Sequence, residues 1–75
     1  MGRLPRVSGA VAIRILERLG FEQVRQRGSH VVLRKSTPDG VVGCVVPLHD
    51  ELAVGTLAGI LRQAKVSADQ FLANA

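Results

Sequence analysis

The sequence feature that most constrains the fold is a turn between two strand-like runs near the middle of the chain. The turn spans residues 36–40, Ser-Thr-Pro-Asp-Gly, in which proline fixes φ and glycine accepts a positive φ. Residues 29–35 precede it and the apolar run 41–46 follows it, and both contain β-branched residues. This pattern predicts an antiparallel hairpin. A weaker strand over residues 21–26 would extend the hairpin into a three-stranded sheet.

Amphipathic helical patterns flank this β region on both sides. Ser8 can cap a helix over residues 8–19. The apolar positions of that helix recur at helical spacing: Ala12, Ile15, Leu16 and Leu19. A second helix follows the strands, with Thr56 able to cap it. Its apolar positions are Leu57, Ile60, Leu61 and Ala64. A capping box at residues 67–70 predicts a short last helix that carries Phe71 and Leu72.

The predicted order, α-β-β-β-α with a short C-terminal helix, belongs to the α+β class and fits one domain over residues 1–75. Two helices on one face of a three-stranded antiparallel sheet would bury both apolar stripes and leave the other sheet face open. The residues expected in the core include Ile15, Leu19, Leu33, Leu57 and Leu61. We interpret Gly55 and Gly59, one helical turn apart, as positions where the helix packs closely on the sheet.

Charge and cysteine content limit the classes of function. The chain carries ten Lys and Arg against six Asp and Glu, a formal net charge of +4. This charge favours RNA, DNA or an acidic protein as the partner, although it also lies in the ordinary range for solubility. Cys44 is the only cysteine, which excludes an intrachain disulfide and is typical of cytosolic domains. We interpret it as a small core residue.

No segment has the pattern of a targeting signal or a membrane span. The N-terminal residues include arginines but no apolar core of a secretory signal. No apolar run approaches the roughly 20 residues that cross a bilayer. We therefore expect a soluble cytoplasmic protein with no membrane partner.

The most informative run for function is RQRGSHVVLRK, residues 25–35. By alternation, His30 lies on the sheet face opposite Val31 and Leu33. Histidine can act as a general acid or base near neutral pH, and guanidinium groups bind phosphates. The candidate RNA-binding residues around His30 are Arg25, Arg27, Gly28, Ser29, Arg34 and Lys35. One interpretation is an RNA-cleaving site with His30 as the catalytic residue. The other is a solvated histidine in a basic strand, which the residues alone favour.

A metal site is the less favoured interpretation of the remaining polar residues. His49 and Asp50 follow the third strand and could in principle join Cys44 and His30 around an ion. This set lacks the paired close spacing of zinc ligands. Local pairing within the loop is the preferred interpretation, and we expect no metal.

Several ordered segments together resemble the HicA-type toxins of bacterial type II toxin–antitoxin modules. They are LPRVSG (4–9), LGF (19–21), RQRGSH (25–30), VPLH (46–49), GTL (55–57) and ILRQA (60–64). The resemblance implies a fold like that of a double-stranded-RNA-binding domain and a metal-independent endoribonuclease that cleaves mRNA. It further implies one essential histidine in the Gly-Ser-His segment, here His30, and no cofactor. A HicB-type antitoxin covering this face is also implied.

One position and one segment depart from the pattern of that family. Many relatives have a second histidine where this chain has Val31, and relatives often carry lysines where residues 50–54 are acidic and then apolar. The second departure subtracts positive charge near the expected RNA face. Two alternatives stay open: a non-catalytic RNA-binding module of the same fold, and an interaction protein that has kept the fold and lost the chemistry. We expect a monomer or weak homodimer when the protein is free.

Overall fold

Helix α1 (Gly9–Arg18) begins at the serine that the sequence indicates, in a computed structural model that describes residues 4–75. The Ser8 hydroxyl accepts a hydrogen bond from the Val11 amide at 3.0 Å, which satisfies one of the free amides of the first turn. Gly20 follows the helix with φ of +100°, a conformation that glycine adopts without strain. The predicted first helix is confirmed.

Three antiparallel strands follow, in the order β1-β2-β3 across the sheet: β1 (Glu22–Arg27), β2 (His30–Thr37) and β3 (Gly40–Pro47). Pro38 and Asp39 form the turn between β2 and β3. The pairing of β2 with β3 is regular, whereas the pairing of β1 with β2 shifts register between Gln23 and Arg25. The predicted three-stranded meander is confirmed, with strand ends that differ by one or two residues.

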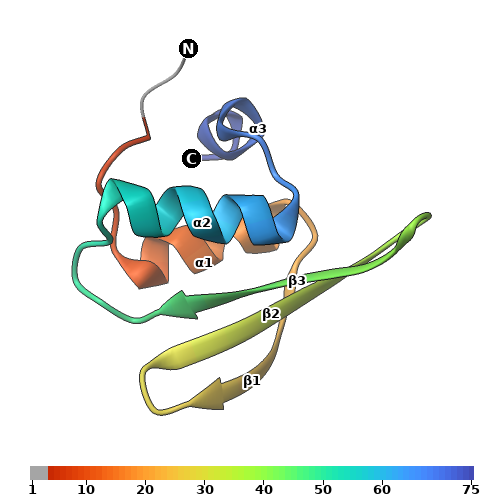
Figure 1. Cartoon of the computed structure of the whole chain (residues 1–75), viewed down its shortest axis with the longest axis horizontal. Helices are drawn as coiled ribbons and strands as arrows, with labels where there is room; N and C mark the ends of the chain where they lie inside the picture. The colour runs from red at the N-terminus through yellow and green to blue at the C-terminus, as the bar shows by residue number, and fades with distance from the viewer. Residues whose placement is uncertain (1–3) are drawn as a thin grey trace.

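Helices α2 (Val54–Ala64) and α3 (Ala68–Ala73) complete the fold of the described residues. Figure 1 shows α1 and α2 on the same side of the sheet, with α3 beyond α2. The hairpin of β2 and β3 extends past the ends of both long helices, and the opposite face of the sheet is uncovered by any element that the structure describes. This is the predicted α-β-β-β-α arrangement. No helix within residues 4–75 combines the length and hydropathy that a membrane span requires.

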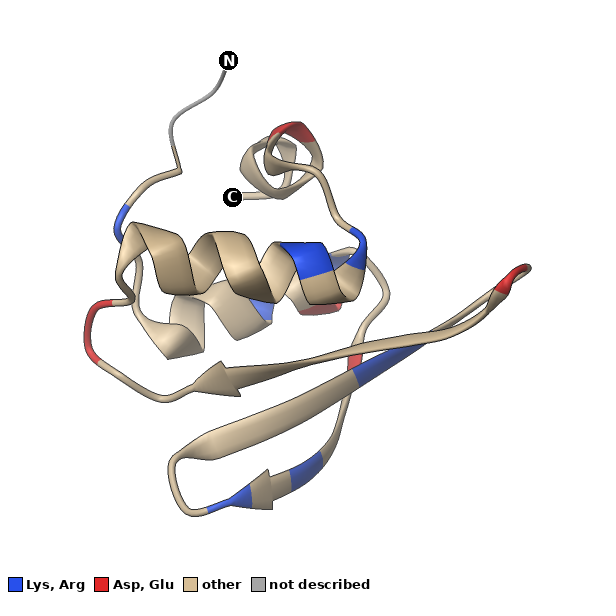
Figure 2. Ribbon diagram, in the orientation of Figure 1, with Lys and Arg blue, Asp and Glu red and all other residues tan. Residues whose placement is uncertain are grey.

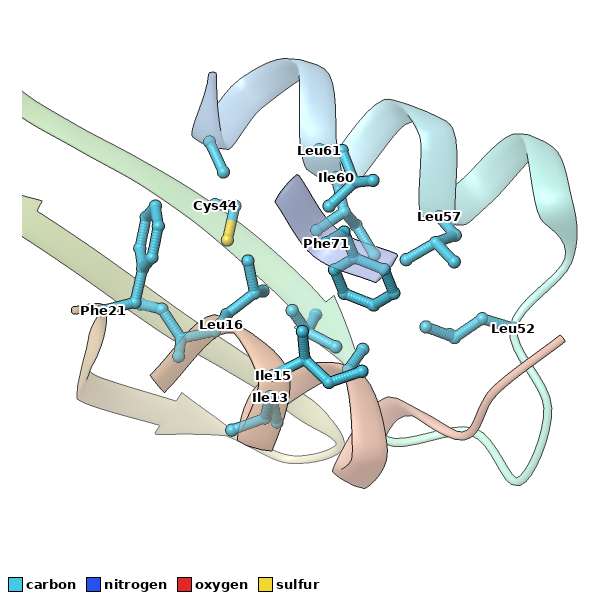
Figure 3. Close-up of a cluster of buried hydrophobic side chains, with 14 of the residues drawn as sticks. Ile13, Ile15, Leu16, Phe21, Cys44, Leu52, Leu57, Ile60, Leu61 and Phe71 are labelled. Carbon is cyan, nitrogen blue, oxygen red and sulfur yellow. The ribbon is translucent and has the colours of Figure 1, made fainter. Parts of the chain in front are cut away.

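The core lies between the helices and the covered face of the sheet. Figure 3 shows side chains from α1, α2, α3 and β3 converging there. Of the five core residues predicted, Ile15, Leu33, Leu57 and Leu61 are buried. Leu19 is only half-buried at the margin of the core. The buried positions also include Ile13, Leu52 and Phe71, and Cys44 is buried as expected.

Two details of α2 differ from expectation. The helix begins at Val54 with Ala53 as its N-cap, so Thr56 lies inside the first turn and caps nothing. The prediction that Gly55 and Gly59 pack closely on the sheet is wrong. A Cβ on Gly55 would meet no atom within 4 Å, and a Cβ on Gly59 would meet only the Arg62 guanidinium. The capping box predicted before α3 is confirmed.

The close backbone contact lies instead at Gly9, where α1 meets the end of β3. A Cβ on Gly9 would overlap the Pro47 carbonyl oxygen and lie 2.9 Å from its carbon. The Gly9 amide also donates to the His49 carbonyl at 2.9 Å, and the Leu52 amide donates to the Val7 carbonyl at 2.7 Å. These contacts, which we call the N-terminal clamp, hold the segment before α1 against the loop after β3.

Candidate nucleic-acid interface

The turn before β2 determines where His30 lies. Gly28 has φ of +54° and Ser29 does not have a positive φ, the pattern of a type II′ hairpin turn with glycine in its first central position. The Ser29 carbonyl accepts a hydrogen bond from the Leu48 amide at 2.6 Å. This bond ties the turn to the end of β3, so the backbone at His30 is held on both sides.

The side chain of His30 lies on the uncovered face of the sheet. Successive residues of β2 alternate between exposed and buried, with Val31 and Leu33 in the core. His30, Val32 and Arg34 therefore share the opposite face, as the sequence predicts. His30 is exposed, which leaves its imidazole accessible to a substrate.

Two arginines of β1 lie on the same face because residues opposite each other in an antiparallel pair project to one side. Arg27 pairs with His30 and Arg25 pairs with Val32. The register shift at Val24 is what aims them there, since strict alternation from Glu22 would send both to the other face. We refer to Arg25, Arg27 and Arg34 as the open-face arginines.

The structure separates Lys35 from these residues. Its ammonium nitrogen lies 5.8 Å from the centre of the Phe21 ring, and its side chain passes beside Gly20. Both neighbours lie at the junction between α1 and β1, on the side of the sheet that the helices cover. Of the predicted basic residues, Arg25, Arg27 and Arg34 share the sheet face of His30 and Lys35 does not.

No carboxylate of the described chain forms a salt bridge with the open-face arginines. Within residues 4–75 the one salt bridge joins Arg6 to Glu51 at 3.0 Å, with both side chains mostly exposed. Glu22, opposite Arg34 in the register, is the acidic residue that shares their face. Figure 2 shows basic positions on β1 and β2 and acidic positions at the hairpin tip and in the loop before α2. The charge near the turn is therefore available to an anion.

A groove of about 470 Å³ adjoins His30 and was not predicted. It is lined by His30, Val45, Pro47, Thr56, Gly59, Ile60, Arg62 and Gln63, so it connects the sheet to the outer side of α2. No sequence pattern marks it, because its walls come from segments that meet only in the folded chain. A second cavity, of about 310 Å³, lies beside Phe21 and Lys35 and contains none of the other predicted site residues.

The remaining titratable residues do not build a second site. His49 is exposed, and its carbonyl accepts the Gly9 amide. Burial raises the pKa of the Cys44 thiol to about 11, which keeps it neutral and unreactive. Among residues 4–75, no three His, Cys, Asp or Glu side chains lie close enough together to hold a metal ion.

Comparison with known proteins adds one finding. A family model described as the HicA toxin of bacterial toxin–antitoxin systems matches residues 10–66. The match includes the three strands, α2 and every residue of the predicted site. No curated protein matches the chain.

Proposed function

Because this chain belongs to the HicA toxin family, we propose that it is an endoribonuclease that cleaves mRNA without a metal ion. The observation that carries the proposal is an exposed histidine on the same sheet face as arginines that form no salt bridge within residues 4–75. His30 lies on the uncovered sheet face with Arg27 directly opposite it, and Arg25 and Arg34 lie farther along the same face. Family membership supports the role of a toxin, and the geometry supports a substrate with phosphates.

The reaction uses a nucleophile that RNA itself carries. The ribose 2′-oxygen attacks the adjacent phosphorus, the bond from phosphorus to the 5′-oxygen breaks, and the products are a cyclic phosphate and a 5′-hydroxyl. His30 takes the proton of the 2′-hydroxyl as general base or supplies one to the leaving 5′-oxygen as general acid. Charge on the phosphorane intermediate is stabilised by arginines beside His30, of which Arg27 is its strand partner.

The residues on either side of the Gly28-Ser29 turn bind the RNA. The open-face arginines bind backbone phosphates, and the Gly28-Ser29 turn offers a close approach with a hydroxyl group. Affinity should therefore fall steeply with salt. The partner that neutralises the toxin is a HicB-type antitoxin that covers the same face. In its complex, His30 should be protected from diethylpyrocarbonate, and unchanged modification in a verified complex would place the antitoxin elsewhere.

The alternative function is a non-catalytic RNA-binding module of the same fold, and the loop before α2 is the feature that favours it. The family resemblance leads to an expectation of lysines in this loop, whereas residues 50–54 are acidic and then apolar. In this chain Glu51 pairs with Arg6 and Leu52 is buried, so both residues serve the fold rather than an RNA partner.

A comparison of His30→Ala with His49→Ala tests the proposal. Both should be assayed beside the wild type on one single-stranded RNA, with a chelator present to exclude metal-dependent contaminants. Loss of a general acid or base should slow cleavage by about 100-fold or more in His30→Ala. His49→Ala serves as the matched control and should cleave normally. Melting temperature should barely change in either variant, because both side chains are exposed. Full activity of a folded His30→Ala protein would favour the binding module.

A further inference from the structure

The groove beside His30 has one wall on the sheet and one on α2. His30, Val45 and Pro47 form the first wall, and the second includes Gly59 and Arg62. Its volume of about 470 Å³ greatly exceeds the roughly 30 Å³ that a water molecule occupies in the liquid. A space of this size accommodates part of one polymer strand.

Arg62 is placed to reach into the groove. Helical side chains lean toward the helix N-terminus, and the Arg62 guanidinium lies back over Gly59, with Nη2 3.8 Å from where a Cβ would be. Gly59 contributes no side chain that would fill this space. Within residues 4–75, where Arg6 and Glu51 form the one salt bridge, Arg62 has no carboxylate partner.

We propose that single-stranded RNA passes from the open sheet face across the end of β3 into this groove, where Arg62 binds a backbone phosphate. The inference rests on the proposed ribonuclease function and assigns the second half of its binding path. The open-face arginines hold the strand on one side of the scissile phosphate and Arg62 holds it on the other, with His30 between them. A guanidinium suits this role because it binds phosphate through paired hydrogen bonds.

Replacement of Arg62 tests the phosphate contact. Arg62→Gln should raise the KM for a short single-stranded RNA by about 10-fold or more, the effect of losing one charge-assisted hydrogen bond, with kcat nearly unchanged. The slope of log affinity against log salt should become shallower by about 0.7, as expected for one lost contact on a single strand. Arg14→Gln is the matched control, since Arg14 is exposed on α1 and does not line the groove. Equal effects of the two variants would mean that the loss of one positive charge explains the weaker binding, and this would overturn the proposal.

Filling the groove tests the path of the strand. Gly59→Leu places a side chain where RNA is proposed to lie, whereas Gly55→Leu, one turn earlier, points into open space and does not line the groove. Both should melt at or above the wild-type temperature because leucine is the better helix former. Only Gly59→Leu should lose cleavage, by about 10-fold or more if it removes a contact of the same strength as that of Arg62. Wild-type cleavage by folded Gly59→Leu would overturn the assigned path.

These outcomes distinguish a failure of the proposed RNA path from a failure of the proposed ribonuclease function. Normal cleavage by Arg62→Gln and Gly59→Leu, together with an inactive His30→Ala protein, would contradict the groove as an RNA path and leave the proposed ribonuclease function supported. An active His30→Ala protein would contradict the proposed ribonuclease mechanism itself. Groove variants that cleave RNA normally yet escape inhibition by an acidic partner would assign the groove to a protein, and the proposal would fail.

Discussion

The substitution Gly9→Ala should destabilise the protein far more than an ordinary change from glycine to alanine. The new Cβ overlaps the Pro47 carbonyl oxygen and lies 3.0 Å from the Leu48 Cα, and these are backbone atoms that no rotamer change can move. The start of α1 must therefore separate from the end of β3. Overpacking of this kind costs about 1–3 kcal/mol. Weakening the bond from the Gly9 amide to the His49 carbonyl adds about 1 kcal/mol.

The sum, about 2–4 kcal/mol, is a large part of the 5–15 kcal/mol that ordinary domains have. Unfolding entropy of about 2.1 cal/mol/K per residue gives about 0.16 kcal/mol/K for 75 residues. The melting temperature of Gly9→Ala should therefore fall by about 13–25 °C.

The assay is thermal unfolding followed by circular dichroism, with Gly55→Ala as the matched control. Gly55 also lies in a helix, but its Cβ would meet open space. Gly55→Ala should therefore raise the free energy of unfolding by about 0.5–1 kcal/mol. The change from glycine to alanine should thus lower the free energy of unfolding at position 9 and raise it at position 55. A Gly9→Ala protein that melts within about 3 °C of the wild type would refute the argument, since that shift corresponds to less than 1 kcal/mol.

Two further predictions concern charge and burial. Arg34→Ala should weaken RNA binding and make its salt dependence shallower. Lys35→Ala should change the affinity and the salt dependence little, because Lys35 lies on the helix-covered side over Phe21. Filter binding across a salt series compares the two variants, and equal losses of affinity would contradict this assignment of faces. For Cys44, the unfolded thiol loses its proton near pH 9.0 and the buried thiol only near 11, so the unfolded state binds fewer protons and stability should fall as pH rises through this window. Urea unfolding at pH 8, 9 and 10 measures the fall, and an equal fall in Cys44→Ala would assign it to other groups.

The elements of this fold are predictable from sequence because local signals agree with the tertiary packing. Ser8, the capping box before α3 and the Pro38-Asp39 turn each specify a boundary through their own backbone chemistry. His30 and Arg34 are assigned to the open face correctly because β2 has no irregularity.

Features that depend on distant segments could not be predicted in the same way. Arg25 and Arg27 owe their orientation to a bulge at Val24, and no residue type marks a bulge there. The spacing of Gly55 and Gly59 predicts close packing of the helix on the sheet, but the sheet passes near neither residue.

The N-terminal clamp has a consequence for synthesis on the ribosome. Helix α1 is made first, but the surfaces that cover its apolar face and hold its first residue, β3 and the loop through Leu52, are made much later. A ten-residue helix is marginal in water without such a partner. The turn that holds His30 waits for the same region, because Ser29 is bonded to Leu48. A chain that ends before Leu48 therefore carries His30 and its arginines without the contacts that hold the turn and the start of α1 in place.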